Sequence, residues 1–220
     1  MLLFPITLLI FLLFIFFLPV LFILGYFEIV TIGFEKLGIS SEATLLLLFL
    51  ILLGSVINIP LTRKKLVYFE QSQFFGLFRI PKIETQYIAI NFGGAIIPIL
   101  LSIYFLFVGW REGFELKPVL IATILMIIIC KFLAKIVPNK GISLPPLMPP
   151  VLSALFALVL SPSFAAPAAF ISGVLGTLIG ADILNLGKVR KYSGFVSIGG
   201  AGVFDGIFLV GIFSALIASL

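Results

Sequence analysis

The chain has no histidine and a single cysteine, Cys130. One cysteine cannot form a disulfide within the chain. The absence of histidine excludes a Ser-His-Asp or Cys-His catalytic centre, a zinc-metalloprotease helix of the H-E-x-x-H type and histidine-ligated haem. Any chemistry must therefore use carboxylates, lysine, serine, tyrosine or backbone groups, and we expect no metal and no cofactor.

Charge is also scarce, since only 10% of the 220 residues are charged while 62% are hydrophobic. Soluble domains are near a quarter charged, and a soluble fold of this size could not bury so much apolar surface. We therefore predict an all-α integral membrane protein with one transmembrane domain over residues 1–220 and the lipid bilayer as its main partner. The net charge of +5 is typical of basic cytoplasmic loops, so we expect no nucleic-acid partner.

Seven stretches are apolar enough to be candidate membrane spans, which need about 20 residues each. The first has no basic leader and no small-x-small cleavage site, so it is predicted to be a retained helix rather than a signal peptide. The fifth is short and flanked by prolines, so we expect it to be tilted, broken or re-entrant. The candidates are Leu2–Phe27, Ala43–Leu61, Ile88–Gly109, Pro118–Val137, Leu147–Leu160, Ala165–Leu186 and Phe195–Leu220.

Basic residues are concentrated in alternate loops between these spans. The loops at residues 62–87 and 187–194, and the end of the fourth span at Lys131, Lys135 and Lys140, carry most of the lysine and arginine, whereas the intervening loops are acidic, mixed or uncharged. With seven spans, all three basic loops lie on one side of the membrane. The positive-inside rule makes that side the cytoplasm, which predicts a multi-pass protein of the cell membrane with a cytoplasmic N-terminus.

The loop at residues 62–87 is the only long one, and it mixes basic residues with aromatic ones such as Tyr68, Phe69 and Phe78. One interpretation is an interfacial segment that rests on anionic lipid head groups. The other is a short hairpin or flap at the mouth of a site.

Two pairs of short segments resemble each other within the chain. Leu53–Ile57 (LGSVI) resembles Leu175–Ile179 (LGTLI), and Gly93–Ala95 resembles Gly199–Ala201. This pattern suggests a parallel internal repeat of the second and third spans by the sixth and seventh, although short Gly/Ala matches are common in membrane helices. The first half, residues 1–110, has no acid within a predicted span, and the second half, residues 111–220, carries two.

Those two acids, Asp182 and Asp205, are the only ones well inside the apolar stretches. A carboxylate in the hydrocarbon region costs at least ~2.5–3.5 kcal/mol on insertion scales, so it faces the interior of a bundle or has a partner. Asp182 lies about 7 Å and Asp205 about 15 Å from the cytoplasmic end of its span, at ~1.5 Å per residue. Their spans are joined by a tight loop and must be neighbours, so we predict a facing pair.

Glycines surround both aspartates. They either loosen the helices beside a site or only allow close helix packing, and Asp205 could simply cap a new helix start after a break. Asp182 could instead bond Asn185, Lys188 or a free backbone amide. The predicted supporting glycines are Gly180, Gly199, Gly200, Gly202 and Gly206, and the predicted polar partners are Asn58, Asn91, Asn185 and Ser197.

The stretches Gly180–Leu186 (GADILNL) and Ser197–Leu209 (SIGGAGVFDGIFL) resemble an uncharacterised archaeal and bacterial membrane family, a domain of unknown function. More weakly, the second half is similar to the GxGD intramembrane aspartyl proteases, which include presenilin, signal peptide peptidase and the prepilin peptidases. The order and orientation of Asp182 and Asp205 match those enzymes, although two residues separate Gly202 from Asp205. The resemblance implies that Asp182 and Asp205 are catalytic.

Those enzymes also have a Pro-Ala-Leu element near the second aspartate. The closest segment here, Leu144–Pro150 (LPPLMPP), precedes the first aspartate. It either reaches the same place in space or is no more than a proline-rich turn.

The sequence therefore leads to two main hypotheses for function. In the first, one carboxyl of the pair activates water and the other protonates the carbonyl of a transmembrane peptide substrate. In the second, the same aspartates couple a secondary transporter to protons or ions, and Asn58, Asn91, Thr177 and Ser197 complete its site. A scaffold whose acids only lock helices together is a third reading.

Overall fold

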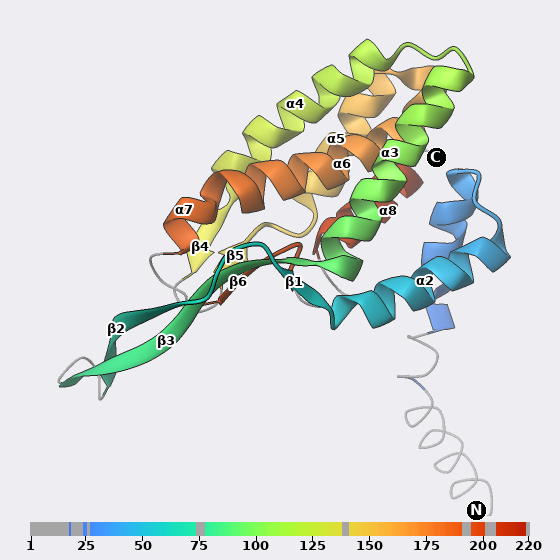
Figure 1. Cartoon of the computed structure of the whole chain (residues 1–220). Helices are drawn as coiled ribbons and strands as arrows, with labels where there is room; N and C mark the ends of the chain where they lie inside the picture. Colours follow the sequence, from blue (N-terminus) through green and yellow to red (C-terminus); the bar gives the residue numbers. More distant parts are fainter. Residues whose placement is uncertain are drawn as a thin grey trace, which may run out of the picture.

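The computed structural model describes Leu18, Leu24, Gly25 and residues 27–73, 78–137, 141–190, 195–200 and 206–218. It is mostly helical, as predicted. Five helices pack side by side in Figure 1: α3 (Ile97–Arg111), α4 (Leu116–Leu133), α5 (Met148–Leu160), α6 (Ala165–Thr177) and α8 (Gly206–Ala218). Short π and 3-10 turns join α6 to α7 (Leu186–Val189), and a π-helical turn at Phe92–Ile96 precedes α3.

The helix α6 lies at the centre of this bundle because its residues are small. Ala168, Ala169, Ser172 and Gly173 are all fully or almost fully buried, and α6 contacts α3, α4, α5 and α8. A Cβ added at Gly176 would lie 2.4 Å from the Met126 side chain, and one at Gly180 would lie 2.3 Å from the Ile127 carbonyl oxygen. These glycines let α6 and the π-helical turn that follows it approach the backbone of α4 closely.

The helical prediction omitted a sheet. Strand β3 (Phe78–Asn91) pairs antiparallel with β1 (Asn58–Pro60) and β2 (Lys65–Gln73), and parallel with β6 (Phe195–Ile198). A second, two-stranded sheet joins β4 (Lys135–Val137) to β5 (Gly141–Ser143). The strands β2 and β3 project from the bundle in Figure 1. Residues 62–87 therefore contain an antiparallel strand pair, whereas their place at the mouth of a site stays a prediction.

Three described helical segments are long and apolar enough to cross a membrane: Phe92–Arg111, Leu116–Leu133 and Pro162–Val189. A fourth is added if Phe27–Lys36 and α2 (Ser41–Ser55), which meet at 119°, count as one broken span. The described residues therefore support three or four crossing helices and not seven. The first predicted span, Leu2–Phe27, lies almost entirely outside the described residues.

The remaining predicted spans differ for local reasons. The third begins only at Phe92 and the last only at Gly206, because the residues predicted to start them belong to the strands β3 and β6. The fifth is the 13-residue helix α5, which has proline in its first turn, as its short, proline-flanked sequence predicted.

The structure does not support an internal repeat. Leu53–Ile57 lies where α2 ends and the chain turns toward β1, whereas Leu175–Ile179 lies inside the continuous helical segment Pro162–Val189. Gly93 and Gly94 lie in a π-helical turn, whereas Gly199 and Gly200 have positive φ angles of 85° and 66°. The similar letters therefore adopt different backbone conformations.

Large apolar side chains are exposed along the outer helices. On α3 they include Leu100, Ile103 and Phe107, and on α4 they include Ile121, Ile124 and Phe132. Contiguous exposed apolar surface of this extent marks contact with a membrane or with another protein.

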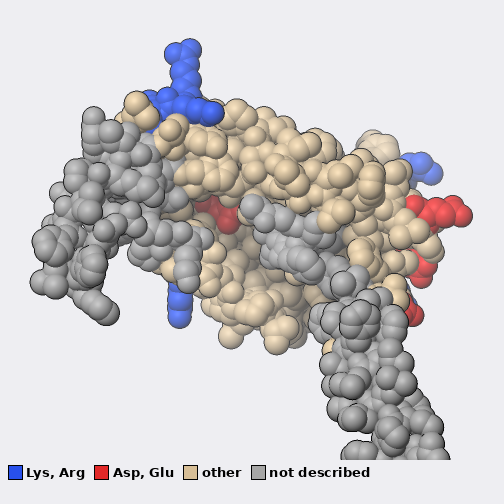
Figure 2. Space-filling model, turned by 90° about the horizontal axis from the view of Figure 1, so that it is seen from below, with Lys and Arg blue, Asp and Glu red and all other residues tan. Residues whose placement is uncertain are grey.

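Figure 2 shows where acidic side chains lie on one face of the molecule. Most of them are at one end, and a further acidic group is visible in a hollow of this face.

We predict that Gly176→Ala lowers the free energy of unfolding by about 1–3 kcal/mol, the usual cost of overpacking, because its Cβ would meet the side chain and backbone of Met126. The matched control is Gly187→Ala, whose Cβ would meet nothing within 4 Å. Unfolding in a mild detergent titrated with a denaturing one measures both. Equal stability of the two variants would contradict the close α6–α4 contact.

Candidate functional site

Asp182 lies at a distorted part of the long helical segment that begins with α6. Residues Leu178–Asp182 form a π-helical turn, and Ile183–Asn185 form a 3-10 turn before α7. Such π-turns within helices occur frequently at functional sites. The side chain of Asn185 donates to the carbonyl oxygens of Gly180 and Ala181, at 3.2 and 3.0 Å. Asn185 therefore satisfies carbonyls of the distorted helix and does not donate to Asp182 in the structure.

The partner of Asp182 is a backbone amide. The N–H of Gly199 donates to Asp182 Oδ2 at 2.9 Å. Of the three partners considered from the sequence, which were Asn185, Lys188 and a backbone amide, the structure shows the backbone amide. Gly199 is buried and has a φ angle of 85°, which favours glycine. A Cβ there would lie 2.5 Å from that of Ala95. Glycine is required at this position both for the turn and for its contact with the π-helical turn before α3.

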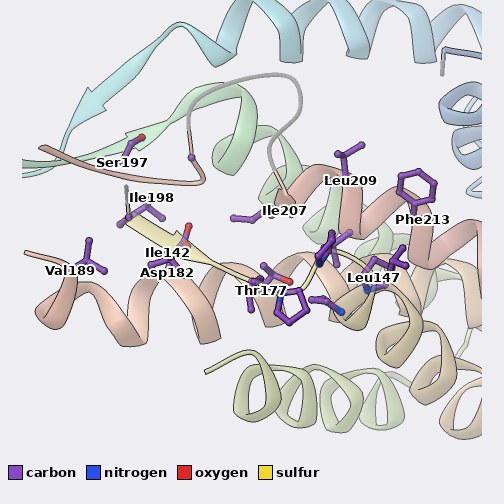
Figure 3. A pocket seen from close by; sticks show the side chains of 18 of the residues that line it. Ile142, Leu147, Thr177, Asp182, Val189, Ser197, Ile198, Ile207, Leu209 and Phe213 are labelled. Atoms are coloured by element: carbon purple, nitrogen blue, oxygen red, sulfur yellow. The ribbon is translucent and has the colours of Figure 1, made fainter. Parts of the chain in front are cut away.

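Asp182 lines a cavity of about 590 Å³, a volume typical of ligand sites. It is the only acidic residue among the described residues of the wall, which include no lysine or arginine. Strand β6 and Gly200 form one side, and Ile207, Val210 and Phe213 of α8 form another. Figure 3 shows Asp182 and Thr177 on the helix across the cavity from α8, with Ser197 and Ile198 of β6 at one end.

The proline-rich segment also reaches this cavity. Leu144, Pro145, Pro146, Leu147, Pro149 and Pro150 all line it. The segment therefore lines the same cavity as Asp182. Its place relative to Asp205, on which the likeness to the proteases depends, stays a prediction. Ile142 of β5 lies in the same wall. Sequence reasoning missed this strand, because three residues between a helix and a proline-rich turn give no periodic signal.

Three of the predicted polar partners form one cluster beside the cavity. Asn58 Oδ1 accepts hydrogen bonds from Ser197 Oγ at 2.6 Å and from Asn91 Nδ2 at 3.2 Å. Asn91 is fully buried; its Nδ2 also donates to the Ser55 carbonyl, and its Oδ1 accepts from the amide of Gly94. Ser197 lines the cavity, and Gly199, the partner of Asp182, is two residues away in the chain. The cluster thus adjoins the Asp182 turn.

Asp205 and Gly202 lie outside the described residues, so the predicted pairing of Asp182 with Asp205 stays a prediction. The described residues that line the cavity on either side of this part of the chain are Gly200 and Ile207. Gly206 is the first residue of α8. Of the predicted glycines in the described part of the chain, Gly180 packs against α4 and Gly199 provides the amide for Asp182.

We predict that Asp182→Ala destabilises the protein by about 1–3 kcal/mol, because the buried amide of Gly199 would lose its acceptor. Asp182→Asn keeps an oxygen at that position and should lose clearly less. Denaturant titration of the purified protein measures both changes. An equal loss of stability in the two variants would show that the hydrogen bond does not contribute to the fold.

Comparison with known protein families gives a match over most of the chain. Residues 52–217 match a family model described as a protein of unknown function (DUF1614); the matched range contains the cavity wall, Asp182 and Asp205. No curated protein matches the chain, and no solved structure matches it.

Proposed function

Because the chain belongs to the DUF1614 family, whose description assigns no activity, we propose a function from the site itself. The protein is an intramembrane aspartyl protease-like enzyme of the cell membrane, with Asp182 and Asp205 as its catalytic pair. Its substrate is a transmembrane peptide, and its N-terminus is cytoplasmic.

The observation that carries this proposal is the setting of Asp182. It is the one acidic side chain in the described wall of a ligand-sized cavity, and a backbone amide holds its carboxylate in place. That amide belongs to Gly199, six residues before Asp205 in the chain, and both Gly200 and Ile207 line the cavity. A catalytic carboxylate has to be oriented by its neighbours and open to water or substrate, and Asp182 meets both conditions.

The chemistry follows from two carboxyl groups that share one proton. The ionised carboxylate takes a proton from water as the water oxygen bonds to the peptide carbonyl carbon. The protonated carboxyl gives its proton to the carbonyl oxygen. Collapse of the tetrahedral intermediate breaks the C–N bond: the amine leaves with the proton that the first carboxylate took from water, and a hydroxyl of the intermediate returns a proton to the second carboxylate. A substrate helix must unwind first, because its own hydrogen bonds shield the peptide bond.

The surroundings of the cavity are consistent with this chemistry. The Leu144–Pro150 segment lines it, and in the resembled proteases a proline-containing element belongs to the active site. Four prolines of this segment line the cavity: Pro145 and Pro146 precede α5, and Pro149 and Pro150 lie in its first turn. Proline has no N–H to satisfy, so this wall is compatible with an apolar substrate backbone held in an extended form.

The charge distribution supports the orientation. Three basic residues, Lys65 in β2, Lys135 in β4 and Lys188 in α7, belong to elements that lie toward the same end of the molecule (Figure 1). The loop from Glu112 to Glu115 joins α3 to α4 at the other end. This asymmetry agrees with a cytoplasmic side at the sheet, which would open the Asp182 cavity toward the cytoplasm.

We expect the purified full chain, in liposomes, to cleave a model single-span peptide. Asp182→Asn and Asp205→Asn should each lower the rate by roughly 10²–10⁴-fold, the usual contribution of a general acid or base. The matched control is Glu115→Gln, an exposed acid in the loop before α4, which should leave the rate unchanged. Fragments analysed by mass spectrometry report the rate, and cleavage that survives both aspartate changes would exclude this function.

The alternative is an ion-coupled transporter, which the Asn58–Asn91–Ser197 cluster favours. It adds amide and hydroxyl oxygens next to the Asp182 turn, and oxygen ligands are typical of proton or ion coupling sites in transporters. Solute uptake into liposomes that follows a pH or Na⁺ gradient, is lost in Asp182→Asn and occurs without peptide cleavage would select this alternative.

A further inference from the structure

The cavity beside Asp182 is strongly asymmetric. The described polar side chains of its wall are Thr177, Asp182 and Ser197, and Asp182 is held next to β6 by the Gly199 amide, whereas the described residues that α8 contributes to the wall are all apolar. Ile207, Val210, Phe213 and Ile217 recur on α8 at spacings of three and four residues, so they form one continuous strip. At 1.5 Å per residue, this strip runs for about 15 Å.

That length equals about half of the ~30 Å hydrocarbon core of a bilayer, the depth that one lipid chain occupies in one leaflet. The cavity also reaches the surface through apolar side chains: Leu147, Val151 and Phe213 line it and are 76%, 48% and 38% exposed. A hydrocarbon chain could therefore pass from the bilayer into the cavity without crossing a polar surface.

The polar end accepts hydrogen bonds. An ionised Asp182 has only acceptor oxygens. The proton of the Ser197 hydroxyl is donated to Asn58 Oδ1. The hydroxyl of Thr177 is engaged with the Cys130 sulfur at 3.7 Å. A complementary head group must supply N–H or O–H donors, and a positive charge would match the carboxylate.

We infer that this cavity binds a single-chain amphiphile from the bilayer, with a primary ammonium head group at Asp182 and its chain along the α8 strip. The carboxylate selects the ammonium by charge and by its three N–H donors. The strip selects a chain about as long as one leaflet is deep. This binding does not depend on the proposed proteolysis and holds whether or not the aspartates cleave peptide bonds.

The test uses the full chain in phosphatidylcholine nanodiscs and radiolabelled tetradecylamine as the probe. We expect saturable binding that excess unlabelled tetradecylamine displaces. Tetradecyltrimethylammonium, which has the same chain and charge but no N–H, should compete roughly tenfold or more weakly. Butylamine, which has the head group without the chain, should not compete. Equal competition by the trimethyl compound, or uptake that does not saturate, would overturn the inference.

Variants locate the site. Val210→Trp fills the cavity and should abolish binding, and Asp182→Asn should weaken it roughly tenfold or more. The control is Leu155→Trp, which adds the same bulk to the outer face of α5, where Leu155 is exposed and outside the cavity wall. Unchanged affinity in Val210→Trp would overturn the inference. If that variant fails to fold, the competition series on the wild-type protein decides.

Discussion

The need to satisfy backbone polar groups inside a very apolar chain governs this structure. Water is excluded from such an interior, so each interruption of a helix or strand leaves N–H and C=O groups that cost several kcal/mol each unless they find partners. The chain switches from strand to helix after β3 and again after β6. At the first switch Asn91 accepts from Gly94, and at the second Asp182 accepts from Gly199. The side chains of Asn91 and Asp182 therefore each satisfy a backbone N–H that the change from strand to helix would leave unpaired.

The fold was predictable where it depends on local composition. Long apolar runs with few charges predicted the helical segments Phe92–Arg111, Leu116–Leu133 and Pro162–Val189, although with other bounds. The sheet was harder, because β6 has only four residues and its partner β3 lies far away in the chain. Residues such as Ile88 and Val196 are apolar in either conformation, so hydropathy alone extended the neighbouring helices into these strands.

The candidate site was predictable in its components but not in its partners. A carboxylate in an apolar helix is costly enough to indicate function by itself, which identified Asp182. Its acceptor role toward Gly199 depends on a turn that parallel pairing of β6 with β3 creates, and no local pattern encodes such a long-range contact. The same is true of Asn58, Asn91 and Ser197, which three separate strands bring together. The pairing of Asp182 with Asp205 stays a prediction.

The parallel pairing of β6 with β3 also has a consequence for biosynthesis. Ser197 and Asn58 bond to each other across 139 residues of chain. A ribosome adding 5–20 residues per second needs on the order of ten seconds to make that stretch. During that interval the edge of β3 that pairs with β6 lacks its partner strand, and Asn58 lacks its bond from Ser197, while the helices between them are made. The cavity is thus assembled last, and only a nearly finished chain can acquire it.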